Sequence, residues 1–171
     1  MTIFLGSAIA LTPVPIIAAY DPKSAITWLA FVFCAIAYML HRKEIGQELL
    51  IAFLFALVVT SYRPYIYVGN NVLLGHINVF PLVAWTAGLV LLREVYERIH
   101  IPHRWLITSA LYLLILFSLE YIGYYLVGIR IAPDSPSLLG LGIIHGPPFI
   151  HVFYVIAGPL YLLLTDYLRV K

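Results

Sequence analysis

Long apolar runs alternate with short polar connections along the whole chain. A membrane-spanning helix needs about 20 mostly apolar residues, and several runs approach that length. They are Ile3–Tyr20, Ser24–Leu40, Glu48–Tyr62, Asn78–Leu92, Trp105–Leu126 and Pro148–Leu168. The pattern predicts an all-α fold, with one integral membrane domain of six transmembrane helices over residues 1–171. Pro13 and Pro15 predict a kink or a break in the first helix, because proline removes a backbone hydrogen bond.

Composition supports this interpretation. Hydrophobic residues make up 63% of the chain and charged residues 11%, whereas a soluble domain carries about 25% charged residues. The net charge of +2 gives no indication of nucleic-acid binding. Cys34 is the only cysteine, so the sequence excludes a disulfide framework and a thiolate metal cluster.

Lysine and arginine predict the orientation of the helices. Seven of them lie in connections on the side of the two termini, and three lie on the opposite side. Positive charge in short loops favours the cytoplasmic side, so we expect a cell-membrane protein with both termini cytoplasmic. The first apolar run has no lysine or arginine ahead of it, which favours a retained helix over a cleaved signal peptide.

Two connections on the expected external side are unusually apolar. They read "YRPYIYVGNNVLLGHIN" and "VGIRIAPDSPSLLGLGIIHGPP", and such loops either pack against the helices or dip into the membrane interface. The two also resemble each other. The matched pairs are Val68–Gly69 with Val127–Gly128, Leu73–Gly75 with Leu138–Gly140, His76 loosely with His145, and Gly88 with Gly158. Either a duplicated helical hairpin with a site between the repeats or chance similarity explains this pattern.

Glu120 is the one charged residue between Ile107 and Ile129. An acid at this depth costs about 2.5–3.5 kcal/mol unless it is partnered or hydrated. It is therefore a candidate catalytic residue, with Tyr124 one helical turn above it on the same face. A structural hydrogen bond between helices is the other interpretation. Arg63 is the expected partner of Glu120, although an arginine at this border also binds lipid headgroups.

Polar residues gather at the predicted external helix starts. Pro147 and Pro148 predict that the last helix begins near residue 148, with His145 just outside it and His151 in its first turn. Asn78, followed by Pro81, marks the start of an earlier predicted helix. Helix starts attract anions, and the candidate ligand-binding residues near them are Arg63, Arg130, His76, Asn78 and Tyr124. Alternatively, the prolines only set helix starts and the histidines face the headgroups.

Metal binding is a further possibility for the same residues. His76, His145, His151 and Glu120 are all zinc or iron ligand types. No two of these histidines have the spacing of a helical metal pair, so we predict no metal site, and no cofactor is identified.

The leading functional hypothesis is a polar site near the external face that binds or processes an amphiphilic lipid or isoprenoid. Glu120, His145 and His151 are its catalytic candidates, and Arg63 or Arg130 would hold an anionic head. The alternative is a non-catalytic subunit or small transporter-like component. The expected partners are membrane lipids, an amphiphilic small molecule and an oligomer or larger membrane complex, without nucleic acid.

The run from Tyr62 to Leu89 resembles a family of carotenoid-biosynthesis membrane proteins, the bisanhydrobacterioruberin hydratase-like proteins. The matching residues are Tyr65, Tyr67, Gly75, Pro81 and Trp85. The resemblance implies an isoprenoid substrate and hydratase chemistry. It departs from the family ahead of the Tyr-x-Tyr element, where Arg63 stands in the region of an acidic residue. The C-terminal part is also similar to small six-helix membrane proteins without a known function.

Overall fold

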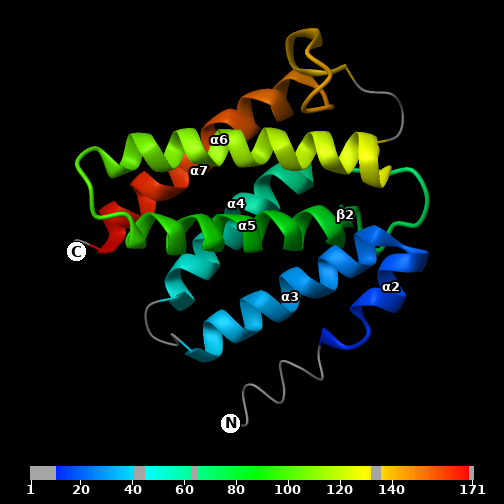
Figure 1. Cartoon of the computed structure of the whole chain (residues 1–171), viewed down its shortest axis with the longest axis horizontal. Helices are drawn as coiled ribbons and strands as arrows, with labels where there is room; N and C mark the ends of the chain where they lie inside the picture. The colour runs from blue at the N-terminus through cyan, green and yellow to red at the C-terminus, as the bar shows by residue number, and fades with distance from the viewer. Residues whose placement is uncertain (1–10, 41–44, 63–64, 132–135, 170–171) are drawn as a thin grey trace. The chain divides into compact units, whose positions relative to one another are not determined.

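The computed structural model describes residues 11–40, 45–62, 65–131 and 136–169, and these residues are mainly α-helical (Figure 1). The predicted all-α fold is confirmed. The only β-strands in these ranges form a hairpin, β1 (Leu73–Leu74) with β2 (Ile77–Asn78). The chain divides into two compact units, Met1–Pro64 with Asn70–Val90, and Tyr65–Gly69 with Leu91–Lys171.

Within the described ranges, four helices are long and apolar enough to cross a membrane. They are α3 (Pro22–Leu40), α5 (Val79–Arg98), α6 (Arg104–Tyr121) with its continuation to Val127, and α7 (Pro148–Arg169). A helix rises about 1.5 Å per residue, so about 20 residues match the thickness of a bilayer core. The helix α4 (Ile45–Tyr62) is also apolar but shorter.

The first predicted helix is broken where its prolines lie. A turn at Thr12 and Pro13 precedes α2 (Val14–Tyr20), and the carbonyl of Pro13 accepts the first described hydrogen bond of α2, from the N–H of Ile17 at 3.0 Å. The prediction of a break is confirmed. The part of this helix before residue 11 lies outside the described residues.

Asp21 separates α2 from α3 and caps the start of α3. Its carboxylate accepts a hydrogen bond from the hydroxyl of Ser24 at 2.6 Å and from the backbone N–H of Lys23 at 3.3 Å. Side-chain oxygens at this position satisfy N–H groups that lack a partner within the helix. The ammonium group of Lys23 donates to the carbonyl of Asn70. The start of α3 is thereby tied to the segment that leads into β1, within the first unit.

The β1–β2 hairpin leads directly into α5. Gly75 has a φ of +63° in its turn, a conformation that glycine adopts without the strain of a Cβ atom. The side chain of Asn78 is buried: its oxygen accepts from the N–H of Phe80 at 3.1 Å, and its amide donates to Asn71 at 2.7 Å. Asn78 therefore caps the start of α5.

In the second unit, α6 and α7 approach each other closely. Pro159 lies inside α7 and has no N–H to donate within that helix. Two side chains of α6 bond to the backbone around it: Tyr112 donates to the carbonyl of Tyr154 at 2.6 Å, and the indole of Trp105 donates to that of Pro159 at 3.3 Å. A Cβ atom on Gly158 would lie 2.7 Å from carbons of the Tyr112 ring. The contact therefore requires glycine.

The matched glycines of the two apolar connections share a backbone conformation. Gly69 and Gly128 have φ values of +82° and +77°, and Gly75 and Gly140 have values of +63° and +76°. All four lie in the left-handed region that favours glycine. The helical pair differs, because a Cβ atom on Gly88 would meet no atom within 4 Å, in contrast to Gly158.

Candidate functional site

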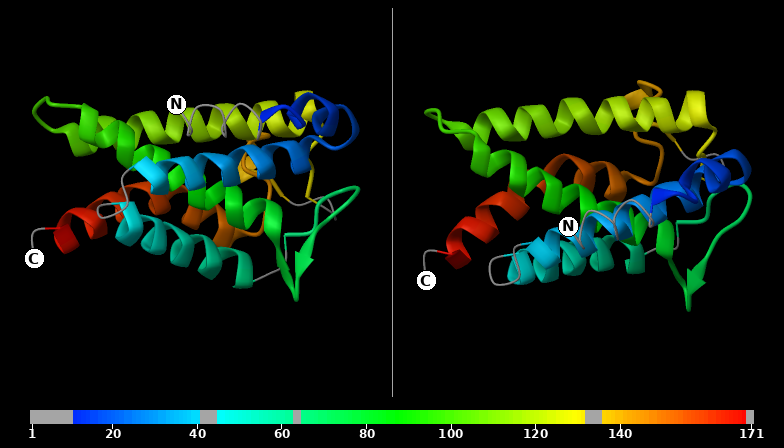
Figure 2. Two further views of the ribbon diagram at one scale, coloured as in Figure 1. Left: turned by 90° about the horizontal axis from the view of Figure 1, so that it is seen from below. Right: turned by 60° about the horizontal axis from the view of Figure 1, so that its bottom comes forward.

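A π-helical turn at the end of α6 gathers tyrosines in the second unit. The turn η1 (Ile122–Val127) continues α6, and Figure 2 shows the two as one rod. The centroids of the Tyr121 and Tyr125 rings lie 4.9 Å apart, and those of Tyr124 and Tyr125 lie 5.0 Å apart. Because a π-helix is wider than an α-helix, it changes the face on which each following side chain emerges. Such turns occur frequently at functional sites.

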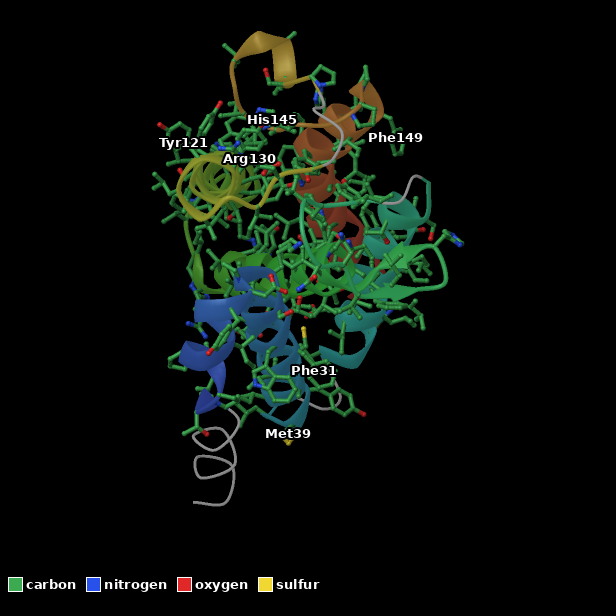
Figure 3. The ribbon with its side chains drawn as sticks, turned by 90° about the vertical axis from the view of Figure 1, so that its right-hand side faces the viewer. Phe31, Met39, Tyr121, Arg130, His145 and Phe149 are labelled. Carbon is green, nitrogen blue, oxygen red and sulfur yellow. The ribbon has the colours of Figure 1, made fainter. Side chains whose placement is uncertain are left out.

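Tyr124 brings together two of the predicted site residues. The imidazole of His145 stacks on its ring, with centroids 3.6 Å apart and planes 8° from parallel. The guanidinium carbon of Arg130 lies 5.1 Å from the same ring centroid, within the range of a cation–π interaction. The Nε atom of Arg130 also donates to the carbonyl of Tyr124 at 3.3 Å. Figure 3 shows Arg130 and His145 close together at this end of α6, with Tyr121 nearby.

A strained loop holds His145 against Tyr124. His145 and Ser137 form an antiparallel β-bridge, and Gly146 donates to the carbonyl of Pro136 at 3.0 Å. The preceding residue, Ile144, is fully buried with a φ of +49°. A β-branched residue rarely adopts this conformation, which costs about 1–3 kcal/mol and persists only where the surroundings impose it. His145 is thus positioned by the loop backbone before any ligand binds.

Glu120 lies near two buried phenols of the segment Tyr65–Gly69. This segment pairs with the chain after η1: Val68 donates to the carbonyl of Arg130 at 2.8 Å. Burial raises the pKa of Tyr65 and that of Tyr67, and the negative charge of Glu120 raises both further. The carboxylate is therefore within electrostatic range of both hydroxyl groups. The sequence indicated these two tyrosines only through the family resemblance.

Tyr65 and Tyr67 are expected to stay protonated in the folded protein at pH values near 10, where an ordinary phenol ionises. Because their pKa values in the folded state lie above that value, the stability from neutral phenols is complete below about pH 10 and is lost as the pH rises further. Ionisation of the tyrosines can be followed by the phenolate absorbance of the folded protein in detergent as the pH is raised. A Tyr65→Phe, Tyr67→Phe variant should match the wild type up to about pH 10. If the variant showed less phenolate absorbance than the wild type below that pH, both phenols would be ionising as exposed tyrosines do.

His151 contacts the loop that carries His145, and the remaining predicted site residues lie in other parts of the chain. His151, in α7, has its Nε2 atom 3.3 Å from the carbonyl of Pro136, to which a ring N–H would donate. His76 is exposed at the tip of the β1–β2 hairpin, which belongs to the first unit. Asn78 caps α5, as described above. Arg63 lies outside the described residues, so its predicted pair with Glu120 is not tested. No cluster of three or more metal-ligand side chains occurs in the described ranges.

A second polar cluster in the same unit was not predicted. Arg93 is 3% exposed and donates to the carboxylates of Asp166 and Glu97 and to the hydroxyl of Thr165. Tyr96 donates to Asp166 at 2.6 Å. Because these groups satisfy one another, the cluster joins α5 to α7 and leaves little polarity for a ligand. Its signal in the sequence is Asp166, the single acid of α7.

Comparison with protein-family models, curated proteins and solved structures found no match for this chain. Beside Tyr124, the side chain of Arg130 is exposed and that of His145 is buried.

Proposed function

We propose that this chain is an integral membrane protein with six transmembrane helices and both termini on the cytoplasmic side. Four long apolar helices support the membrane location. The shorter α4 and the apolar N-terminal run would supply the other two spans. The excess of lysine and arginine in the connections on the side of the termini supports the orientation. The matched left-handed glycines support an origin of two helical hairpins by duplication.

We propose further that the second unit binds an amphiphilic lipid or isoprenoid with an anionic head. The observation that carries this proposal is the exposure of Arg130 and its lack of a described carboxylate partner. Its side chain is exposed and, within the described part of the chain, pairs with no carboxylate. Tyr124 and the bond to its carbonyl fix the guanidinium in place, which leaves the terminal nitrogens available for a phosphate or carboxylate.

The surroundings of Arg130 suit the apolar part of such a ligand. Leu119 and Leu126 are largely exposed on α6 and η1, as are the rings of Tyr121 and Tyr125. An aliphatic or polyunsaturated chain could lie along this surface while its head meets Arg130 and His145. The resemblance of the Tyr65–Trp85 region to carotenoid-biosynthesis proteins favours an isoprenoid among the possible chains. Glu120 and His145 are then the candidates for proton transfer to a bound ligand.

Replacing Arg130 with alanine is expected to reduce the retained amphiphile by about tenfold or more, because a hydrogen bond to a charged group contributes about 1.5–3 kcal/mol. The measurement is quantitative mass spectrometry of the lipids that remain bound after extraction in a mild detergent. Arg98→Ala is the matched control, because Arg98 is an exposed arginine of the same unit whose ion pair with Glu94 is long, at 3.5 Å.

Equal lipid profiles for the wild type and Arg130→Ala would refute the proposed site. Equal losses in both arginine variants would indicate a general effect of charge instead. If the purified protein retained no amphiphile but copurified with a larger membrane protein, the non-catalytic subunit would be the better assignment.

A further inference from the structure

The β1–β2 hairpin exposes apolar side chains outside any helix. Leu74 is 70% exposed and Val72 is 64% exposed, and His76 follows them at the tip. The sequence has no Asp, Glu, Lys or Arg between Arg63 and Arg93. The hairpin therefore lacks the charges that keep an exposed loop in water. Figure 2 shows it projecting beyond the start of α5.

The loop before α7 has the same character in the second unit. Leu139 is 87% exposed and Leu141 is 65% exposed, on either side of Gly140. The sequence has no charged residue between Asp134 and Asp166. In Figure 1 this gold loop stands clear at the start of α7.

A left-handed glycine follows an exposed leucine in each loop. Gly75 and Gly140 both have positive φ values, and Leu139 itself has a φ of +51°. A leucine in this conformation is strained, and the strain here presents an apolar side chain to the surroundings. Because both loops have this geometry, we regard the exposed leucines as a built feature of each loop.

The position of each loop in the chain identifies what covers these leucines. Strand β2 passes directly into α5 at Val79, and the second loop reaches α7 at Pro148. Both of these helices are long and apolar enough to span a membrane. Leu74 lies five residues before α5 and Leu139 nine residues before α7, so each loop adjoins the expected membrane border of its helix. Apolar side chains at that level bury themselves about 5–10 Å into the boundary of headgroups and acyl chains.

We propose that both loops insert their leucines into the lipid bilayer, where they anchor the starts of α5 and α7 at a fixed depth. The partner of each loop is the lipid surface at which its own helix begins. For the second loop, insertion also fixes the level of His145, which the same loop carries. The proposal requires the membrane location but not the ligand site at Arg130, so either can fail without the other.

Spin labels at single cysteines test this proposal in reconstituted vesicles of phosphatidylcholine and phosphatidylglycerol. Cys34→Ser removes the only native cysteine, and Leu74→Cys or Leu139→Cys then places the label. Collisions with oxygen, which concentrates in lipid, are compared with collisions with a water-soluble nickel chelate. Leu114→Cys is the lipid-facing reference, since Leu114 is similarly exposed within α6. His100→Cys is the reference in the charge-rich connection between α5 and α6.

Labels at residues 74 and 139 are expected to collide more with oxygen than with the nickel chelate, as the label at Leu114 does. The opposite preference at either position, as expected for His100, would overturn the proposal for that loop. If a variant does not elute as a single species, Val72→Cys or Leu141→Cys tests the same loop. If the spin labels gave the expected collisions but the protein retained no amphiphile, the ligand site at Arg130 would be refuted and the insertion of the loops would stand.

Discussion

Asp166→Ala is expected to lower the free energy of unfolding by about 3 kcal/mol, because removal of one partner leaves the buried charge of the other poorly compensated. Asp166 accepts hydrogen bonds from Arg93 and Tyr96. Without it, the nearly inaccessible guanidinium of Arg93 would lose that carboxylate and keep its bond to Glu97. Since Glu97 remains, we expect a loss near the lower end of the range for broken buried pairs, about 3–5 kcal/mol.

Glu94→Ala is the matched control for this experiment. Glu94 pairs with Arg98 at 3.5 Å, and the Arg98 side chain is 81% exposed. Exposed ion pairs contribute about 0–1 kcal/mol, so the control should change stability little. Both variants can be compared by reversible unfolding in mixed detergent micelles. Equal small losses would mean that the cluster around Arg93 does not join α5 to α7 in the folded protein.

Gly158→Ala is expected to lower the free energy of unfolding by about 2–3 kcal/mol, because overpacking a close contact in a protein interior carries a cost of this order. The added methyl group would lie 2.7–2.8 Å from three carbons of the Tyr112 ring. The ring cannot easily turn away, since its hydroxyl donates to the carbonyl of Tyr154. The clash should therefore separate α6 from α7 or break that hydrogen bond.

Gly88→Ala provides the control, because Gly88 is the glycine of α5 that matches Gly158 in the sequence comparison. A Cβ atom there meets no atom within 4 Å. Alanine is favoured over glycine inside a helix by about 1 kcal/mol, so this variant should be as stable as the wild type or more stable. Thermal unfolding in the same detergent gives the comparison. If Gly158→Ala were as stable as Gly88→Ala, the close packing of α6 on α7 would be wrong.

The sequence was most informative where a local pattern decides the structure. The length and composition of the apolar runs were enough to predict an all-α fold, because the membrane requires each spanning segment to satisfy its own backbone. The break at Pro13 followed from the missing N–H of proline. The prediction that Tyr124 shares a face with Glu120 assumed an α-helix, and the π-helical turn η1 changes that register. The number of spans beyond the four long helices stays a prediction.

Features that depend on distant contacts were not predictable. Arg93 and Asp166 lie 73 positions apart, so nothing near either residue indicates the pair. The π-helical turn after Tyr121 has ordinary helix-compatible residues, and its register depends on packing. Likewise, the stack of His145 on Tyr124 requires a left-handed Ile144, a conformation that no local preference of isoleucine would suggest. Sequence reasoning named His145, Arg130 and Tyr124, but not the contacts that bring them together.

The most direct test of the proposed site is an experimental density map of the protein in lipid nanodiscs. The account predicts an elongated amphiphile whose anionic head lies within hydrogen-bonding distance of the Arg130 guanidinium and whose chain follows α6 and η1. It also predicts that His145 stays stacked on Tyr124. A map in which Arg130 pairs with a carboxylate of the protein, with no amphiphile beside Tyr124, would contradict the account.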